Sequence, residues 1–528
     1  MVNARDESFV LAIDLGTGGP KIGLVSITGQ VAFKCHSQVA TRTLGDGGQV
    51  QDPNEWWKII CDAIREALSR RVVPADRVVA VAATGQWAST IPVNARGVPV
   101  GDCLMWMDTR GGPYSRDAVG GPIQGYAPRA IFEWVRRTGG APSTSGADPT
   151  GHILFIENAM KDVASETAWY LEPVDYLSMR FTGVAAASHA SMTAAWLTDN
   201  RHLGSLSYDP VLLKLSGIPV GKLPRLRPTC SVIGEVRPEV AEALGLAPGV
   251  KVVTGIPDLH SAVVGSGAVD DYQAHMTIST SSWISCPIPF KKTDPIRQIA
   301  SVPGLTNFGY LVGNNHETAG LCLQWLRDSV LFASDGLRAG SMVDGVPGFD
   351  QLTDLASSVA PGSGGAIFTP WLAGERSPVD DKRARGGFHN LSLESSRASL
   401  VRAVLEGVAY NSRWLFEAVE HFVKKKLPSV RIIGGGAQSD LWCQIHADVM
   451  DRTVERIADP LNANLRGAAI FAGMAMGDIK RAEVAELIEV DRVFRPDPIN
   501  RAIYERLYPE FPKLYKSQKG MFSRLNGR

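Results

Sequence analysis

The sequence lacks three features that would each point to a class of protein: a long apolar run, a net charge and paired cysteines. No apolar run approaches the ~18 residues that a membrane-spanning helix requires. The 54 basic residues equal the 54 acidic ones in number, so no net field attracts nucleic acid or an anionic membrane. The seven cysteines are scattered and never in CxxC spacing, which argues against disulfides or a zinc site. We therefore expect a soluble, cytoplasmic protein with no nucleic-acid or membrane partner.

The length indicates more than one hydrophobic core. At 528 residues, the chain exceeds what a single core normally holds, so we expect two or three structural units. We place the N-terminal domain at 1–264, the C-terminal domain at 265–490 and a charged helical tail at 491–528. No interface stripe identifies the oligomeric state, and a homodimer is among the options left open.

The opening stretch predicts a strand, a tight turn and a returning strand. Apolar, often β-branched residues at 10–13 and 22–27 flank a glycine-rich break. Such a break lets the backbone turn sharply and bring its N–H groups close to a phosphate. Asp14 ends the first strand, where a carboxylate suits Mg²⁺, held directly or through its waters; an ordinary hairpin is the alternative. The candidate phosphate-binding residues are Gly16, Thr17, Gly18 and Lys21.

Polar and aromatic residues follow two further predicted strands. In an α/β chain, side chains at the carboxyl end of a strand are the ones that meet a ligand. Asp108 and Arg110 could grip vicinal hydroxyls or form a structural ion pair, and the spacing allows both. The candidates are Gln86 and Trp87 after the strand predicted at 78–83, and Trp106, Asp108 and Arg110 after the next one.

The remaining landmarks lie around the middle of the chain and beyond it. Asp258 lies on the turn after a buried strand predicted at 250–253, and is either a helix N-cap or a general base. Residues 272–286 give a strand, a hydroxyl-rich turn and a strand, which is a weak echo of the opening hairpin. Residues 430–437 predict a strand and a glycine turn that opens a helix, where bare N–H groups suit a nucleotide. The two hairpins together predict a duplicated fold that grips a polyphosphate from both sides.

With these landmarks, the chain resembles the FGGY family of carbohydrate kinases, and within it the xylulokinases. The resemblance extends over most of the chain and depends on the order of several motifs. They are Ile13–Thr17, Gln51–Pro53 with Trp56 and Trp57, Gly85–Gln86, Trp106 with Asp108 and Arg110, Asp175–Leu177, Gly255 with Asp258, Gly374–Arg376, and Gly434–Ala437 with Ser439, Trp442 and Asp448.

The resemblance implies an α/β fold of two actin/hexokinase-like (ribonuclease H-like) domains with a deep cleft between them, which binds ATP and a small sugar. It implies that Asp14 and Thr17 lie by the phosphates and Mg²⁺, and that Asp258 is the catalytic base. It assigns the sugar pocket to Gln86, Trp87, Trp106, Asp108, Arg110 and Asp258. It assigns the nucleotide side to Thr280, Ser281, Gly435, Gly436, Ala437 and Ser439.

Three departures from the family pattern bear on the substrate and on ATP. Trp87 and Ala88 stand where a xylulokinase usually has Met and His, and Leu259 stands where the family has a polar amide, so the pocket is more apolar and D-xylulose is not the expected best substrate. Ser279 stands where the family has a glycine in the second phosphate turn. The leading hypothesis is ATP- and Mg²⁺-dependent phosphorylation of a ketose (a xylulose-like pentulose) or a polyol. The alternatives are a non-catalytic sugar or nucleotide sensor and an actin-like filament ATPase.

Overall fold

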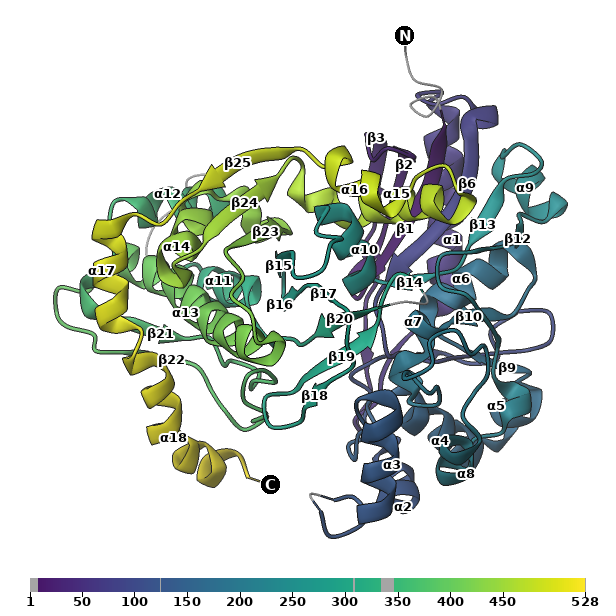
Figure 1. Cartoon of the computed structure of the whole chain (residues 1–528), viewed down its shortest axis with the longest axis horizontal. Helices are drawn as coiled ribbons and strands as arrows, with labels where there is room; N and C mark the ends of the chain where they lie inside the picture. Colours follow the sequence, from purple (N-terminus) through teal and green to yellow (C-terminus); the bar gives the residue numbers. More distant parts are fainter. Residues whose placement is uncertain (1–7, 124, 307–308, 334–345, 528) are drawn as a thin grey trace.

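Two mixed β-sheets organise the chain in the computed structural model, which describes residues 8–123, 125–306, 309–333 and 346–527 (Figure 1). The N-terminal sheet has the strand order β12, β13, β6, β1, β2, β3, and β14 also pairs with β6. β1 runs antiparallel to β2 and parallel to β6. The bounds are Phe9–Gly16 for β1, Gly19–Ser26 for β2, Val31–His36 for β3, Val78–Gly85 for β6, Val232–Glu235 for β12, Lys251–Val253 for β13 and Ile256–Pro257 for β14.

The C-terminal sheet repeats this arrangement. Its strand order is β16, β15, β23, β24, β25. β15 runs antiparallel to β16 and parallel to β23, as β1 does to β2 and β6, so the echo predicted between the two hairpins is confirmed in the topology. The bounds are Ala274–Ile278 for β15, Ser282–Ser285 for β16, Ser429–Ile433 for β23, Thr453–Ile457 for β24 and Val490–Phe494 for β25.

Two helices, α10 (Asp258–Ser266) and α15 (Ala463–Met476), pack against each other between the sheets (Figure 1). Glycine permits this close approach: a Cβ on Gly265 would overlap the carbonyl of Ala463, and one on Gly467 would overlap that of Ser261. α15 also packs against β1 and β6, and α10 against β15 and β23. One hydrophobic cluster therefore combines residues from both halves of the chain.

The other helices lie outside this central pair. None of the helices in the described residues is long and apolar enough to cross a membrane. In the N-terminal half they are α1 (Pro53–Ser69), α2 (Gly112–Val119), α3 (Pro128–Thr138), α4 (Pro149–Ala159), α5 (Lys161–Glu166), α6 (Pro173–Thr182), α7 (His189–Met192), α8 (Pro210–Ser216) and α9 (Pro238–Leu244). In the C-terminal half they are α11 (Gly320–Trp325), α12 (Phe349–Ser357), α13 (Arg397–Val423), α14 (Asp440–Met450), α16 (Arg481–Leu487), α17 (Pro498–Leu507) and α18 (Glu510–Asn526).

A small sheet of β17 to β20 connects the C-terminal half to the N-terminal half. Tyr310 Oη donates to the carbonyl of Asn200 at 2.9 Å, and His260 Nε2 lies 2.8 Å from the carbonyl oxygen of Pro303. The strands are Pro287–Ile288, Thr293–Asp294, Ile299–Pro303 and Tyr310–Gly313.

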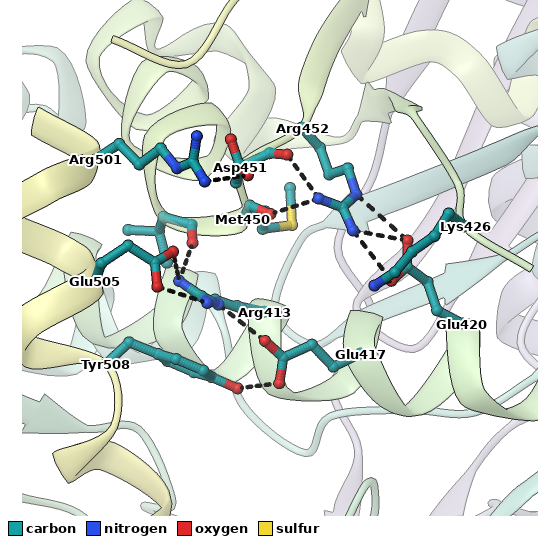
Figure 2. Close-up of polar contacts among 11 residues, drawn as sticks. Arg413, Glu417, Glu420, Lys426, Met450, Asp451, Arg452, Arg501, Glu505 and Tyr508 are labelled. Atoms are coloured by element: carbon teal, nitrogen blue, oxygen red, sulfur yellow. Dashed lines mark hydrogen bonds and ion pairs between the residues drawn. The ribbon is translucent and has the colours of Figure 1, made fainter. Parts of the chain in front are cut away.

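The end of the chain differs from the helical tail expected at 491–528. It begins with β25, which pairs antiparallel with β24 as the edge strand of the C-terminal sheet. Helix α17 then packs against α14, and its Glu505 lies 2.7 Å from Arg413 of α13 (Figure 2). The charged residues of this stretch predict an exposed helix. Its first part is a strand instead because it pairs with β24, a partner that sequence periodicity does not reveal.

Candidate active site

Three predicted site residues meet at one edge of the N-terminal sheet. β6 lies parallel to both β1 and β14, with Asp14 opposite Thr84 and Pro257 opposite Gly85. The carboxyl ends of these strands therefore bring together Asp14, Gln86 and Asp258, as expected for a ligand site in such a sheet. The backbone N–H of Gln86 donates to the carbonyl of Leu15 at 2.8 Å, which ties the two loops together.

Asp258 is the first residue of α10, and the negative charge of Asp14 acts on its carboxyl. Burial, and then the negative charge of Asp14, raise the pKa of Asp258 to about 7, although the N–H of Leu259 and the ammonium of Lys21 lower it. Oδ1 of Asp258 accepts the N–H of Leu259 at 2.8 Å. The N-cap position itself belongs to Pro257. A carboxyl with a pKa near neutrality is well matched to accept a proton from a hydroxyl.

The hairpin of β1 and β2, predicted to bind phosphate, is held by polar contacts from neighbouring segments. Lys21 Nζ lies 3.5 Å from Asp14 Oδ2, and Gln51 Nε2 donates to the carbonyl of Thr17 at 2.8 Å. Trp106 Nε1 donates to Thr17 Oγ1 at 3.2 Å. This last contact joins a predicted sugar-side residue to a predicted phosphate-side residue. Gly18 is exposed, and Gly16 and Thr17 are half-buried.

The predicted sugar-side residues Gln86 and Trp87 differ in how their polar groups are used. Both amide atoms of Gln86 are buried and have no partner among the described residues. Leaving such a group unpaired costs about 1–3 kcal/mol, which a ligand would offset. Trp87 Nε1 donates to the carbonyl of Ser191 at 2.7 Å, and its ring meets the His260 ring edge-on at 6.2 Å between centroids. The hydrogen bond and the ring contact therefore fix the side chain of Trp87, whereas the amide of Gln86 is available to bind a ligand.

Asp108 and Arg110 form an ion pair, which is one of the two arrangements that their spacing in the sequence allows. Arg110 Nη2 donates to Asp108 Oδ2 at 2.7 Å, and Nε lies 3.1 Å from both carboxylate oxygens. Asp108 is fully buried and also accepts the N–H of Gln49 at 3.0 Å. Both of its oxygens are thus used within the protein, and the guanidinium stacks over Phe155 at 4.8 Å.

The predicted nucleotide-side turns lie next to each other in the C-terminal half. Thr280 and Ser281 occupy the turn between β15 and β16, and the glycine turn follows the adjacent strand β23. Gly434 has φ 91°, and a Cβ there would lie 2.5 Å from the carbonyl oxygen of Ile278. A Cβ on Gly436 would overlap the side chain of Ile278 as well. Only glycine allows the turn to pack this closely on the end of β15.

Other residues of the glycine turn leave backbone open or cap the next helix. A Cβ on Gly435 would meet nothing within 4 Å, so this segment faces open space. Ala437 is buried. Ser439 is the N-cap of α14, and its hydroxyl accepts the N–H of Trp442 at 3.2 Å. Ser279, which replaces a family glycine, does not have a left-handed backbone, so the second phosphate turn forms without glycine.

Sequence reasoning missed two buried side chains behind the sugar side. Glu172 Oε2 accepts the N–H of Ser89 at 3.2 Å, and Ser89 Oγ accepts the N–H of Trp106 at 3.0 Å. Glu172 stands before Pro173 at the start of α6, where an acidic residue is commonplace. No local pattern connects it with a residue that lies 83 positions earlier.

Comparison with known proteins agrees with this architecture. The chain is 27% identical over 521 residues to a gluconokinase of Bacillus subtilis, covering 98% of each chain. It is 26% identical over 524 residues to a xylulose kinase of Staphylococcus epidermidis, covering 97% of each. The crystal structure of a ligand-bound xylulose kinase from Lactobacillus acidophilus matches with a TM-score of 0.83 at 22% identity, over 98% of this chain and 100% of that one.

The family models cover most of the chain. Residues 9–265 match the N-terminal domain of the FGGY family of carbohydrate kinases, and residues 285–476 match its C-terminal domain. Together with the two-domain fold shared with sugar kinase structures, these matches show that the chain belongs to the FGGY family of carbohydrate kinases.

Proposed function

We propose that the protein transfers the γ-phosphoryl group of ATP to a hydroxyl of a small ketose or polyol, with Asp258 as the general base. The observation that carries this proposal is the position of Asp258 at the strand ends beside Asp14 and Gln86, with a pKa of about 7. Asp258 would accept the proton as the hydroxyl attacks, a role typically worth about 10²–10⁴ in rate.

The donor groups fit Mg²⁺ bound together with phosphates. No cluster of three or more His, Cys, Asp or Glu side chains suited to a metal occurs in the part of the chain that the structure describes. Mg²⁺ in kinases commonly needs only one or two carboxylates, since phosphates and waters complete its shell. Asp14, close to a second carboxyl, would hold it directly or through water. When bound, Mg²⁺ neutralises charge on the transferred phosphoryl group.

The two hairpins would hold the polyphosphate from opposite sides. Backbone N–H groups and Oγ1 of Thr17 on one side, and the hydroxyls of Thr280 and Ser281 on the other, suit phosphate oxygens. The exposed backbone at Gly435 would lie along the nucleoside. Gly16, Gly18 and Lys21 complete the first side, and Gly436, Ala437 and Ser439 shape the second.

The sugar side supports a substrate with an apolar face. Leu259, next to the proposed base, belongs to the hydrophobic core and offers no polar group. Trp87 donates its indole N–H to the carbonyl of Ser191, so its ring would contact a sugar by stacking on C–H groups. Gln86 supplies a free amide. Relatives are named for xylulose, gluconate and glycerol, and we place the substrate among ketoses and polyols that present fewer hydroxyls to this wall.

A coupled ADP-release assay with Mg·ATP tests the proposal. The panel contains D-xylulose, other ketoses of three to seven carbons, glycerol and longer polyols, and D-gluconate as the acidic comparison. Asp258→Asn should lower turnover at least about a hundredfold, whereas Asp270→Asn, an exposed acid just after α10, should not. Unchanged turnover in Asp258→Asn would remove this residue from the mechanism. ATP binding without turnover on any compound would support a non-catalytic sensor instead.

A further inference from the structure

The turn after β6 contains a left-handed residue that is not glycine. Ala88 has φ 62°, a conformation that an L-residue keeps only where surrounding contacts hold it. It lies directly between Trp87 of the proposed sugar pocket and the buried Ser89. The direction of the side chains before it therefore depends on what holds this turn.

The contacts that hold the turn come from Glu172. Its Oε2 accepts the N–H of Ser89 at 3.2 Å, and the N–H of Ala88 also interacts with the carboxyl. Glu172 is 2% exposed. Its position follows from strand pairing, because β9 (Trp169–Leu171) runs antiparallel to β7 (Ile91–Val93) with Leu171 opposite Ile91. The residue that follows β9 thus meets the segment that precedes β7.

Glu172 accepts these N–H groups from a desolvated site. Burial, and then the charge of Asp175, raise the pKa of Glu172 well above its ordinary value, against the two backbone N–H groups that lower it. No ion pair to Glu172 occurs in the described residues. Asp175 interacts with the side chain of Ser191, and the carbonyl of Ser191 accepts the indole N–H of Trp87.

We propose that Glu172 is a positioning residue of the sugar pocket, which sets the directions of Gln86 and Trp87 by holding the Ala88–Ser89 turn. This inference rests on the proposed function, because the pocket matters only if the protein phosphorylates a sugar or polyol. It concerns a residue outside the motifs that identify the family, and it acts through backbone rather than by touching the phosphoryl group.

Two variants separate the hydrogen bond from mere occupancy of the site. Glu172→Leu fills a similar volume without an acceptor and should raise the KM for the accepted sugar about tenfold, or about 1.4 kcal/mol. The KM for ATP should stay within about twofold, because the nucleotide turns lie in the other half of the chain. Glu172→Gln keeps one carbonyl oxygen and should restore the sugar KM to within about threefold of the wild type.

Glu420→Leu is the matched control. Glu420 is likewise buried and accepts a backbone N–H, that of Leu427 at 2.9 Å, but it lies on α13 in the polar cluster of Figure 2. Its loss should lower the melting temperature and leave the sugar KM unchanged. Ala88→Gly is a second control: glycine suits the left-handed backbone and keeps the N–H that Glu172 accepts, so both KM values should stay within about twofold of the wild type.

Three outcomes would overturn the inference: an unchanged sugar KM in folded Glu172→Leu, an equal rise in both KM values, or no recovery with Glu172→Gln. If Glu172→Leu does not fold, Glu172→Asp decides in its place: its shorter side chain draws the acceptor away from Ser89 and should raise the sugar KM and not the ATP KM, and an unchanged sugar KM would overturn the inference. A wild-type protein that phosphorylates no compound of the panel refutes the proposed function instead, so the two failures can be told apart.

Discussion

Replacing Asp258 by asparagine should lower turnover at least about a hundredfold and, at neutral and higher pH, stabilise the fold. The folded protein holds the proton of Asp258 up to about pH 7, whereas the unfolded chain releases it near the ordinary pKa of 3.8. Between these values the folded state binds more protons than the unfolded state, so the free energy of unfolding falls as the pH rises. Above about pH 7 the loss is complete.

The magnitude follows from the same interval. About 3 pH units correspond to about 4 kcal/mol, at 1.36 kcal/mol for each unit. Because Asp258 is partly exposed, screening by water reduces this free-energy difference, and we expect a loss of stability of about 2 kcal/mol. Asparagine has a similar shape and no charge, so the variant avoids this loss. Such a gain of stability on removing a reactive group is the usual trade-off between stability and activity.

Urea unfolding of the metal-free, nucleotide-free protein measures the effect. The free energy of unfolding of Asp258→Asn should exceed that of the wild type by about 2 kcal/mol at about pH 8, with a smaller difference at about pH 5. Asp270→Asn, whose carboxyl is exposed, should show no such dependence. An equal difference at both pH values, or a wild type that is the more stable at the higher pH, would refute the electrostatic reasoning.

Three further predictions follow from other parts of the structure. Gly435→Leu should fold normally, since nothing lies within 4 Å of a Cβ there, but raise the KM for ATP at least about tenfold in steady-state kinetics; an unchanged KM would separate this turn from the nucleotide. Arg402→Met removes the cation that pairs with the buried Glu406 at 2.8 Å, leaves that carboxylate only its hydrogen bonds from Gly362, Ser363 and Tyr504, and should destabilise the protein by about 3 kcal/mol in urea unfolding. The KM values of Arg402→Met for sugar and ATP should be unaffected, and a urea midpoint equal to that of the wild type would contradict the importance of this buried ion pair. EDTA should abolish turnover and excess Mg²⁺ restore it, and full activity in EDTA would exclude a required metal.

Local sequence patterns predicted the elements whose cause is itself local. The hairpin that carries Thr17 and its counterpart around Thr280 depend on apolar runs and turn residues within about ten positions. Parallel pairing then follows from the alternation of strands and helices, and it brings Asp14, Gln86 and Asp258 to one edge of a sheet. The residues alone therefore predicted the α/β class and the repeated hairpin, whereas the resemblance to the FGGY family implied the two-domain fold and the grouping of these three residues.

Other features depended on partners that are distant in the sequence. The spacing of Asp108 and Arg110 allowed a ligand grip or an ion pair, and the burial of both side chains decided for the ion pair. The edge strand Val490–Phe494 was predicted to belong to a helical tail because its apolar alternation is weak, and only pairing with β24 makes it a strand.

The sequence by itself determined a duplicated α/β fold with its glycine-rich turns, because these depend on apolar periodicity and on the backbone freedom of glycine. Its resemblance to the FGGY family implied the kinase activity and the role of Asp258 as base. Only the tertiary structure decided which polar groups are used internally, which are left for a ligand, and that Glu172 supports the pocket turn. The physical reason is that desolvation and hydrogen-bond partnership are properties of a group's three-dimensional surroundings. Those surroundings are built from segments, such as 86–89 and 172–175, that only folding brings together.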